Sequence, residues 1–217
     1  MNRMKTWESE RLGKFSASQI HRLLVSGKTK NRLFGDTALS YIYEIVAEMF
    51  TGESKASVSS RAIEWGSENE AEAIEAYREH TGRNVTYFGK ENPVFFQIKD
   101  MPVGGSPDAL IEDKRVIEIK CPYDSANHIE NSIMTVEEFK QKRKEYYAQV
   151  QMLMIVTNVM TADFCSFDPR VINDAYRLSV LEVPFDKAFC DNMLMRIREA
   201  AMIRNDIYNR LIRREAA

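Results

Sequence analysis

The stretch that decides the fold is 104-GGSPDALIEDKRVIEIKCPY-123. It holds two short apolar runs, Asp108–Ile111 and Arg115–Lys120, which polar residues separate, and this pattern predicts two adjacent strands of a hairpin. Successive side chains of a strand point to opposite faces. Glu118 and Lys120 are therefore expected on one face of the second strand, in a sheet whose other face is apolar.

The hairpin is also expected to bring Asp108 to the face that carries Glu118 and Lys120. Mg²⁺ usually takes one or two carboxylates, with water and phosphate oxygens as its other ligands. A lysine in the same cluster could orient or deprotonate an attacking water. The alternative is a surface hairpin with a simple Glu118–Lys120 salt bridge. Gly104 and Gly105, which would let the backbone pass close to a ligand, and the apolar flanks favour the metal site.

A third acid is expected beside this hairpin. Over residues 61–81 apolar positions recur every three or four residues, which predicts an amphipathic helix. Glu70 falls on its apolar stripe together with Ile74 and Tyr77. An acid on a buried stripe needs a partner, and a cation or a lysine would serve. A structural arginine is the alternative partner.

The rest of the chain alternates between helical and extended patterns. Further helices are expected over 16–25 (capped by Ser16), 36–51 (capped by Asp36), 135–157 and 186–214, and further strands over 85–88, 94–98, 161–167 and 177–183. This order predicts an α/β fold with a central mixed β-sheet flanked by helices. Because no repeat or linker divides the sequence, we expect a single domain over residues 1–217.

Composition limits the classes of protein that this chain can belong to. The apolar fraction of 44% and the charged fraction of 29% are ordinary for a globular domain. No apolar run approaches the roughly 18 residues of a membrane span, and the first residues lack the core of a signal peptide. Three scattered cysteines suit a reducing compartment. We therefore expect a cytoplasmic protein without a membrane partner.

The charge distribution permits a polyanionic partner. The formal net charge is −2, but residues 1–34 hold eight Lys/Arg against two acids, a balance of +6. A second basic cluster lies at residues 140–144. Such clusters can also be ordinary solvated faces. A site built on acids would still need nearby positive charge to receive a nucleic acid.

Several motifs in order carry a resemblance that covers most of the chain. They are ERLGKFSAS, LSYIYEIVAE, EWGSENEAEA, GGSPDALI, IEIKCPY and YAQVQMLMIVT. With these motifs the sequence resembles the bacteriophage lambda exonuclease type of viral recombination nuclease, also called YqaJ-like, within the PD-(D/E)xK superfamily. The resemblance implies a restriction-endonuclease-like PD-(D/E)xK core and a nuclease function.

The resemblance also implies roles for the clustered residues. Asp108 and Glu118 match the metal-binding carboxylates, and the main-chain carbonyl of Ile119 is implied as a further ligand. Lys120 resembles the catalytic lysine. Glu70 resembles the upstream helix acid of the metal and catalytic site. The implied cofactor is Mg²⁺, with Mn²⁺ as a substitute.

Three more residues receive roles from matching motifs. Gln149 matches the glutamine that accompanies the site in the YxAQVQ helix, although a satisfied amide in the core is the alternative. Arg11 and Ser18 match positions that hold the 5′-phosphate of a DNA end. The alternatives are a surface salt bridge of Arg11 with Glu8 or Glu10, and a capping role for Ser18 within a helix.

The family's function implies processive 5′→3′ degradation of one strand of duplex DNA, which leaves a 3′ overhang. It further implies a phage single-strand annealing protein as partner and a ring-shaped homotrimer around the DNA. Two other functions remain open at this point. One is a restriction-type or repair endonuclease with the same metal site, and the other is a non-catalytic DNA-end-binding partner of an annealing protein.

Overall fold

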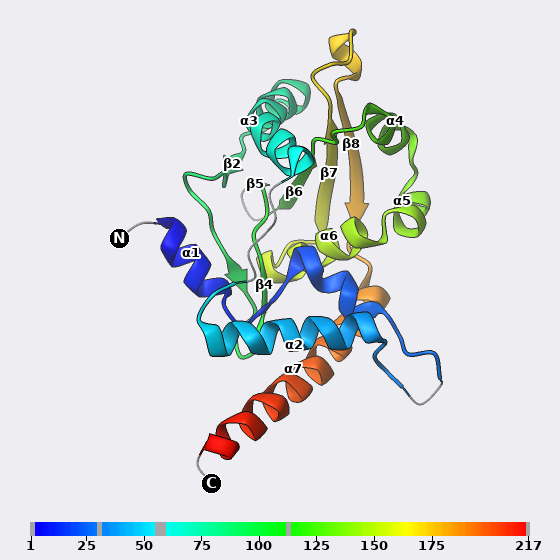
Figure 1. The fold of residues 1–217 in the computed structure, drawn as a ribbon. Helices are drawn as coiled ribbons and strands as arrows, with labels where there is room; N and C mark the ends of the chain where they lie inside the picture. Colours follow the sequence, from blue (N-terminus) through cyan, green and yellow to red (C-terminus); the bar gives the residue numbers. More distant parts are fainter. Residues whose placement is uncertain (1–2, 30–31, 55–59, 112–113, 216–217) are drawn as a thin grey trace.

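The computed structural model describes residues 3–29, 32–54, 60–111 and 114–215 (Figure 1). Its helices are α1 (Arg3–Arg11), η1 (Ala17–Leu24), α2 (Asp36–Thr51), α3 (Arg61–Thr81), α4 (Ser125–Ile133), α5 (Val136–Lys142), α6 (Lys144–Thr157), η2 (Asp174–Tyr176) and α7 (Lys187–Glu215), where η marks a 3-10 helix. Its strands are β1 (Phe15–Ser16), β2 (Thr86–Tyr87), β3 (Phe96–Gln97), β4 (Val103–Gly105), β5 (Ala109–Ile111), β6 (Arg115–Lys120), β7 (Thr161–Phe167) and β8 (Leu178–Pro184).

The main sheet has five strands in the order β2-β5-β6-β7-β8. Strands β6 and β7 pair in parallel, and the other neighbours pair antiparallel. A parallel pair needs a long crossover connection, which α4, α5 and α6 supply. The predicted hairpin is present as β5 and β6, although residues 112–113 of its turn lie outside the described residues. The predicted mixed sheet flanked by helices is thus confirmed.

The central strand separates two hydrophobic clusters. Val116 belongs to the larger cluster, which η1, α2, α6 and α7 build on one face of the sheet. Ile117 and Ile119 point the other way and pack with Ile74 and Tyr77 of α3. This alternation along β6 is the one that the sequence pattern predicts. It leaves Glu118 and Lys120 on the α6 side of a sheet that is covered on both faces.

A second, three-stranded sheet in the order β1-β4-β3 joins the N-terminal segment to the centre of the chain. Strand β1 pairs in parallel with β4, with Phe15 opposite Val103 and Ser16 opposite Gly104. Strand β4 was not predicted, because Val-Gly-Gly has no alternation of apolar and polar side chains. The pairing carries the N-terminal residues to the chain segment that leads into Asp108.

Several local predictions were wrong. The segment predicted as a helix from Ser16 forms the 3-10 helix η1, and the Ser16 side chain makes no capping hydrogen bond. The helix expected over 135–157 divides at Arg143, whose φ of −119° and ψ of 53° are not helical. Asp36 is the first residue of α2, after the N-cap residue Gly35. Helix α4 and helix α1 were not predicted at all.

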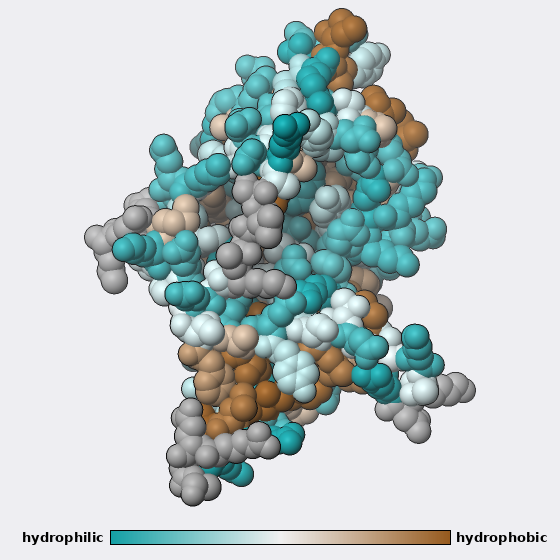
Figure 2. Space-filling view, in the orientation of Figure 1, coloured by the Kyte–Doolittle hydropathy of each residue, from teal (hydrophilic) through white to brown (hydrophobic). Residues whose placement is uncertain are grey.

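No helix within the described ranges combines the length and the apolarity that crossing a bilayer requires. Cys121, Cys165 and Cys190 are buried and free. On the face that Figure 2 shows, hydrophobic side chains gather where α7 runs below α2, and hydrophilic side chains cover most of the upper half.

Gly104 offers a test of this packing. A Cβ atom added there would collide with the Phe95 ring and with the main-chain oxygen of Phe96. We expect Gly104→Ala to lower the free energy of unfolding by about 1–3 kcal/mol, because overpacking forces neighbours out of place. Denaturant titration measures the change.

Gly66 in α3 is the matched control. Its added Cβ would meet no heavy atom closer than the Cys121 oxygen at 3.9 Å, so Gly66→Ala is expected to raise stability by about 0.5–1 kcal/mol. Equal effects of the two substitutions would contradict the close approach of β4 to its neighbours.

Candidate active site

Asp108 stands between the two sheets. It follows β4 by three residues and comes directly before β5. Its Oδ2 accepts a hydrogen bond of 2.6 Å from the main-chain N–H of Ile119. This bond holds the carboxylate beside β6, at the position between Glu118 and Lys120. The hairpin thus gathers the three residues as the sequence predicts.

Glu118 is almost completely buried, with 1% of its surface exposed. Its Oε1 accepts from the Lys120 ammonium at 2.5 Å and from the Gln149 amide at 2.6 Å. Its Oε2 is buried and has no hydrogen-bond partner among the described residues. A buried anionic oxygen without a partner is costly. The structure therefore brings Gln149 to the site and leaves one oxygen of the Glu118 carboxylate without a hydrogen-bond partner among the described residues.

Glu70 comes from α3 and completes the acidic group. Its Oε1 accepts from the Tyr87 hydroxyl at 2.9 Å, so its partner is a tyrosine and not the arginine considered as the alternative. Burial first, and Glu70 next, raise the pKa of Tyr87, which stays protonated as a donor. Sequence reasoning missed Tyr87, because only the pairing of Tyr87 with Ala109 places it beside Asp108.

The two carboxyl groups of the hairpin destabilise each other's charged form. Burial, followed by the Glu118 carboxylate, raises the pKa of Asp108 well above its ordinary value. Burial also raises the pKa of Glu118, against the opposing effect of Lys120. Burial acts to lower the pKa of Lys120, but Glu118 and Asp108 outweigh it and raise that pKa. Lys120 is therefore an ammonium, and with both carboxyl groups ionised the site would hold more negative charge than this one cation balances.

The acids do not form a complete cage. Over the described ranges, no three His, Cys, Asp or Glu side chains are arranged to hold a metal ion by themselves. A cation here would need other oxygen ligands as well, such as a main-chain carbonyl, water or a phosphate. That set of ligands suits Mg²⁺, which keeps several waters and binds through one or two carboxylates.

Arg11 is the last residue of α1, and Ser18 lies in η1, two residues after β1. The Arg11 guanidinium stands 4.1 Å from the centre of the Trp7 ring, and the Trp7 indole N–H donates to Ser106 Oγ at 2.8 Å. Ser18 is exposed, and its hydroxyl lies 3.2 Å from the Ser16 hydroxyl. Trp7 was not predicted as part of the site. Its contacts connect Arg11 to the segment that precedes Asp108.

The Arg11 side chain has no hydrogen bond or ion pair with any residue that the structure describes. The salt bridge with Glu8 or Glu10, which was the alternative to a phosphate-binding role, is thus not formed. Burial lowers the pKa of Arg11, which means that the surroundings do not fully offset the loss of water around its charge. A partly buried guanidinium in this state favours an anionic ligand.

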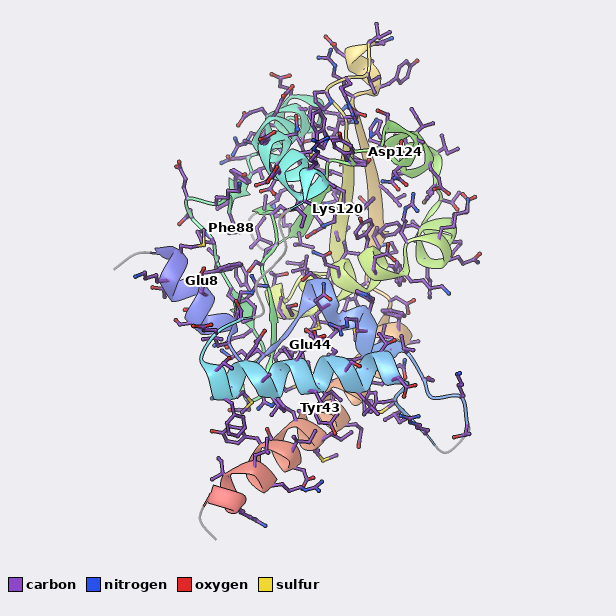
Figure 3. All side chains as sticks on the ribbon, in the orientation of Figure 1. Glu8, Tyr43, Glu44, Phe88, Lys120 and Asp124 are labelled. Atoms are coloured by element: carbon purple, nitrogen blue, oxygen red, sulfur yellow. The ribbon has the colours of Figure 1, made fainter. Side chains whose placement is uncertain are left out.

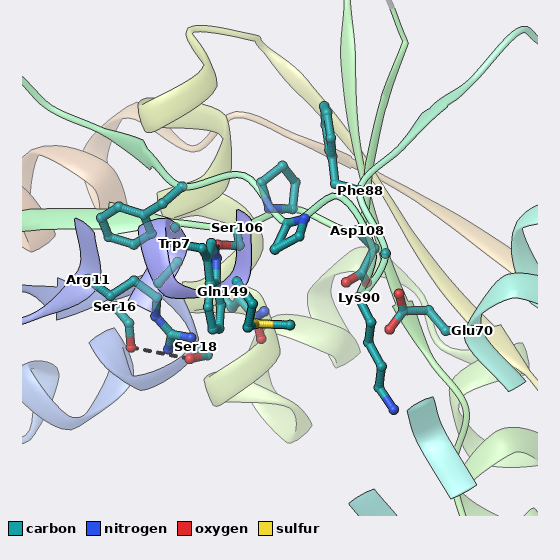
Figure 4. Close-up of a pocket in the computed structure, with 17 residues that line it drawn as sticks. Trp7, Arg11, Ser16, Ser18, Glu70, Phe88, Lys90, Ser106, Asp108 and Gln149 are labelled. Atoms are coloured by element: carbon teal, nitrogen blue, oxygen red, sulfur yellow. Dashed lines mark hydrogen bonds between the residues drawn. The ribbon is translucent and has the colours of Figure 1, made fainter. Parts of the chain in front are cut away.

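One cavity of about 280 Å³ joins these two groups. It is lined by Arg11 and Ser18 at one end, by Glu70 and Asp108 at the other, and by Gln149 between them (Figure 4). In Figure 4 the carboxylates of Glu70 and Asp108 point toward one another, and the Arg11 guanidinium lies beside Ser18. The residues predicted from separate motifs therefore share one space.

A second cavity of about 680 Å³ opens from the same acids in another direction. It too is lined by Glu70 and Asp108, and also by Lys120 and Ile119. The turn after Lys120 and the start of α6 also line it. Figure 3 shows Lys120 at the end of β6, where the chain turns toward Asp124 and α4. The acids thus lie where two open spaces meet.

Comparison with known proteins identifies the family. The family model described as the YqaJ-like viral recombinase domain matches residues 6–160. This match contains Arg11, Ser18, Glu70, the β5–β6 hairpin and Gln149. No curated protein sequence matches the chain.

Solved structures agree in fold. An alkaline exonuclease from Laribacter hongkongensis, LHK-Exo, is 26% identical, with a TM-score of 0.79 and 98% of each chain covered. A phage related exonuclease from Haemophilus somnus 129PT is 18% identical, with a TM-score of 0.74, 91% of this chain and 96% of that chain covered. The second likeness shows the fold alone. The family supports a nuclease role in recombination, and the chain belongs to the YqaJ-like viral recombinase domain family, with the fold of the lambda-type alkaline exonucleases.

Proposed function

We propose that this chain is a Mg²⁺-dependent exonuclease. It degrades one strand of linear double-stranded DNA in the 5′→3′ direction from 5′-phosphorylated ends and leaves 3′ overhangs for homologous recombination. The observation that carries the proposal is the single cavity that joins Arg11 and Ser18 to Asp108 and Glu70. An anion held at one end of this cavity sets how far a strand can reach toward the acids at the other end.

The anion end suits a terminal phosphate. A guanidinium without an anionic partner and a neighbouring hydroxyl can both donate to phosphate oxygens, and such charge-assisted bonds are strong. A solved relative, LHK-Exo, has a structure in complex with dAMP. A 5′-mononucleotide of this kind is the product expected when a terminal nucleotide is released with its phosphate at Arg11.

The acidic end suits Mg²⁺. Glu118 Oε2 has no hydrogen-bond partner among the described residues, and the two buried carboxylates repel each other. A bound cation would relieve both. Asp108, Glu118 and the Ile119 carbonyl would hold the ion, with Glu70 facing it from α3. When bound, Mg²⁺ supplies Lewis-acid activation of water and charge stabilisation at the scissile phosphate.

The remaining residues orient and balance this cluster. Lys120 donates to Glu118, which places an ammonium beside the acids, where it can stabilise negative charge or orient an attacking water. The Gln149 amide, which lies on α6, donates to the same Glu118 oxygen and helps to hold it in place. Tyr87 donates to Glu70 and so sets the direction of that carboxylate.

The preference for ends is tested with two DNA substrates. With Mg²⁺ present, we expect nucleotide release from linear 5′-phosphorylated duplex and no cleavage of covalently closed circles. End labels on either strand terminus report the polarity. Asp108→Ala and Lys120→Ala are each expected to abolish release while the fold is kept, as circular dichroism would report. Nicking of the closed circle would favour the endonuclease alternative and overturn the proposal.

Arg11 is tested through the chemistry of the DNA end. We expect Arg11→Ala to slow release from 5′-phosphorylated ends by about 10- to 150-fold, the loss of one hydrogen-bonded charge contact. Ends with a 5′-hydroxyl should be affected much less. Arg210→Ala, which removes an exposed arginine of α7, is the matched control and should act like the unmodified chain. Equal slowing on both kinds of end would rule out a phosphate-binding role for Arg11.

Cation binding is tested without activity. Because the pKa of Asp108 is raised on folding, its contribution to stability is complete below the unfolded pKa of about 4 and is lost as pH rises through the folded pKa. In chelator, Asp108→Asn should therefore unfold at higher urea than the unmodified chain at neutral pH, with the gain absent below about pH 4. Millimolar Mg²⁺ should stabilise the unmodified chain and not the variant. The same Mg²⁺ shift in both would refute the site.

The partners stay predictions. A ring-shaped homotrimer predicts a mass in solution of three chains, and a monomeric mass on DNA would exclude it. A single-strand annealing partner predicts co-purification with such a protein when the two are expressed together, and its consistent failure would count against that partner.

A further inference from the structure

The second cavity extends the site on the side away from Arg11. It shares Glu70 and Asp108 with the first cavity, so a strand that passes the acids can occupy both spaces. On the proposed function, the terminal nucleotide lies in the first cavity with its 5′-phosphate at Arg11, and the scissile phosphate lies at Asp108. The second cavity then offers a place for the next nucleotide of the same strand.

Two aromatic rings line this second cavity, and they differ in what they already contact. The Tyr146 ring stacks on Phe164 with centroids 5.7 Å apart, and the Lys120 ammonium lies 5.1 Å from its centre. Tyr123 comes three residues after Lys120, and 49% of its surface is exposed. An exposed ring in the cavity beside the scissile position is available to a ligand that brings its own flat face.

Tyr123 is held in a defined place although it is exposed. Its ring meets the Trp65 ring edge to face, with centroids 6.2 Å apart. The Arg170 guanidinium covers the Trp65 ring at 4.4 Å and donates to the Pro122 carbonyl at 3.2 Å. Asp168, which is fully buried, in turn accepts from Arg170 at 2.8 Å.

Together these contacts fix the turn between β6 and α4. They connect α3, the segment after β7 and the turn itself, so that the ring is fixed relative to Lys120. A ring that is fixed in advance loses little entropy when it stacks on a ligand.

We infer that Tyr123 is a stacking platform for the base of the second nucleotide, the one on the 3′ side of the scissile phosphate, with Arg170 and Trp65 as its positioning residues. Base–aromatic stacking accepts any base, because every base has a π face. Such a platform suits an enzyme that must advance along a strand of any sequence. It would also hold the second nucleotide while the first is released.

The test pairs a missing ring with a missing base. Substrates carry an unpaired 5′ end, so that loss of a base does not change duplex stability, and an abasic residue is placed at the first or the second nucleotide. Single-turnover release of the first nucleotide is measured with Mg²⁺. Binding of the same ends is measured by fluorescence anisotropy without Mg²⁺.

We expect the abasic residue at the second position to slow release by about 5- to 150-fold, the range of one base–aromatic stack. Tyr123→Ala should cause a similar loss on the intact strand and little further loss on the strand that is abasic at the second position. Tyr123→Phe should keep most of the activity. Arg170→Lys, which keeps the charge but loses the planar contact with Trp65, should weaken the coupling.

Matched controls separate the ring from its surroundings. Tyr176→Ala removes another exposed tyrosine, one that lines neither cavity, and should leave both measurements unchanged. The abasic residue at the first position should slow the unmodified chain and Tyr123→Ala by the same factor. Tyr123→Ala and the abasic residue at the second position could instead slow release independently, so that their two factors multiply in the combined measurement. That result would overturn the stacking role of Tyr123.

The proposed function and this inference fail in different ways. If nucleotides are not released with Mg²⁺ but the coupling persists in the binding measurement, only the proposed function is lost. If release is normal and Tyr123→Ala matches the unmodified chain on intact ends, only the platform is lost.

Discussion

Two carboxylates buried beside one another on a single hairpin are the constraint on which the site depends. Burial and the Glu118 carboxylate raise the pKa of Asp108, and the Lys120 ammonium and the Ile119 N–H partly offset that rise. The Lys120 ammonium and the Gln149 amide both donate to Glu118. One Glu118 oxygen remains without a partner among the described residues. In an ordinary protein core, a buried carboxylate oxygen has a hydrogen-bond partner. An oxygen left without one is expected in a site that receives a cation.

The small sheet decides what this cluster can act on. Because β1 pairs with β4, Arg11 and Ser18 lie at the far end of the cavity that begins at Asp108. The Trp7 ring contacts both Arg11 and Ser106, and so it connects the Arg11 end of the cavity to the segment that precedes Asp108. The same acids with the N-terminal segment elsewhere would still suit hydrolysis of a phosphodiester. The β1–β4 pairing adds a place that can hold the end of a DNA strand. The proposed preference for DNA ends follows from this.

Much of this arrangement could be predicted from the sequence, and the exceptions have physical reasons. The β5–β6 hairpin and the inward position of Glu70 were predictable, because burial imposes a period on the side chains. Helix α1 was not, since Met4 and Trp7 are its only large apolar residues and form no repeating stripe. The break at Arg143 has no Gly or Pro to signal it and is stabilised by distant acceptors, Asn131 and Glu130. Tyr87 joins the site through strand pairing alone, which one sequence does not reveal.

The central claim is that the hairpin acids bind a catalytic cation, and diffraction from crystals grown with Mn²⁺ tests it most directly. Anomalous scattering locates the ion without any assumption about ligands. The account predicts a strong anomalous peak in contact with the carboxylates of Asp108 and Glu118, on the side that Glu70 faces. Anomalous peaks found only elsewhere, in crystals of a protein that Mn²⁺ activates, would contradict it.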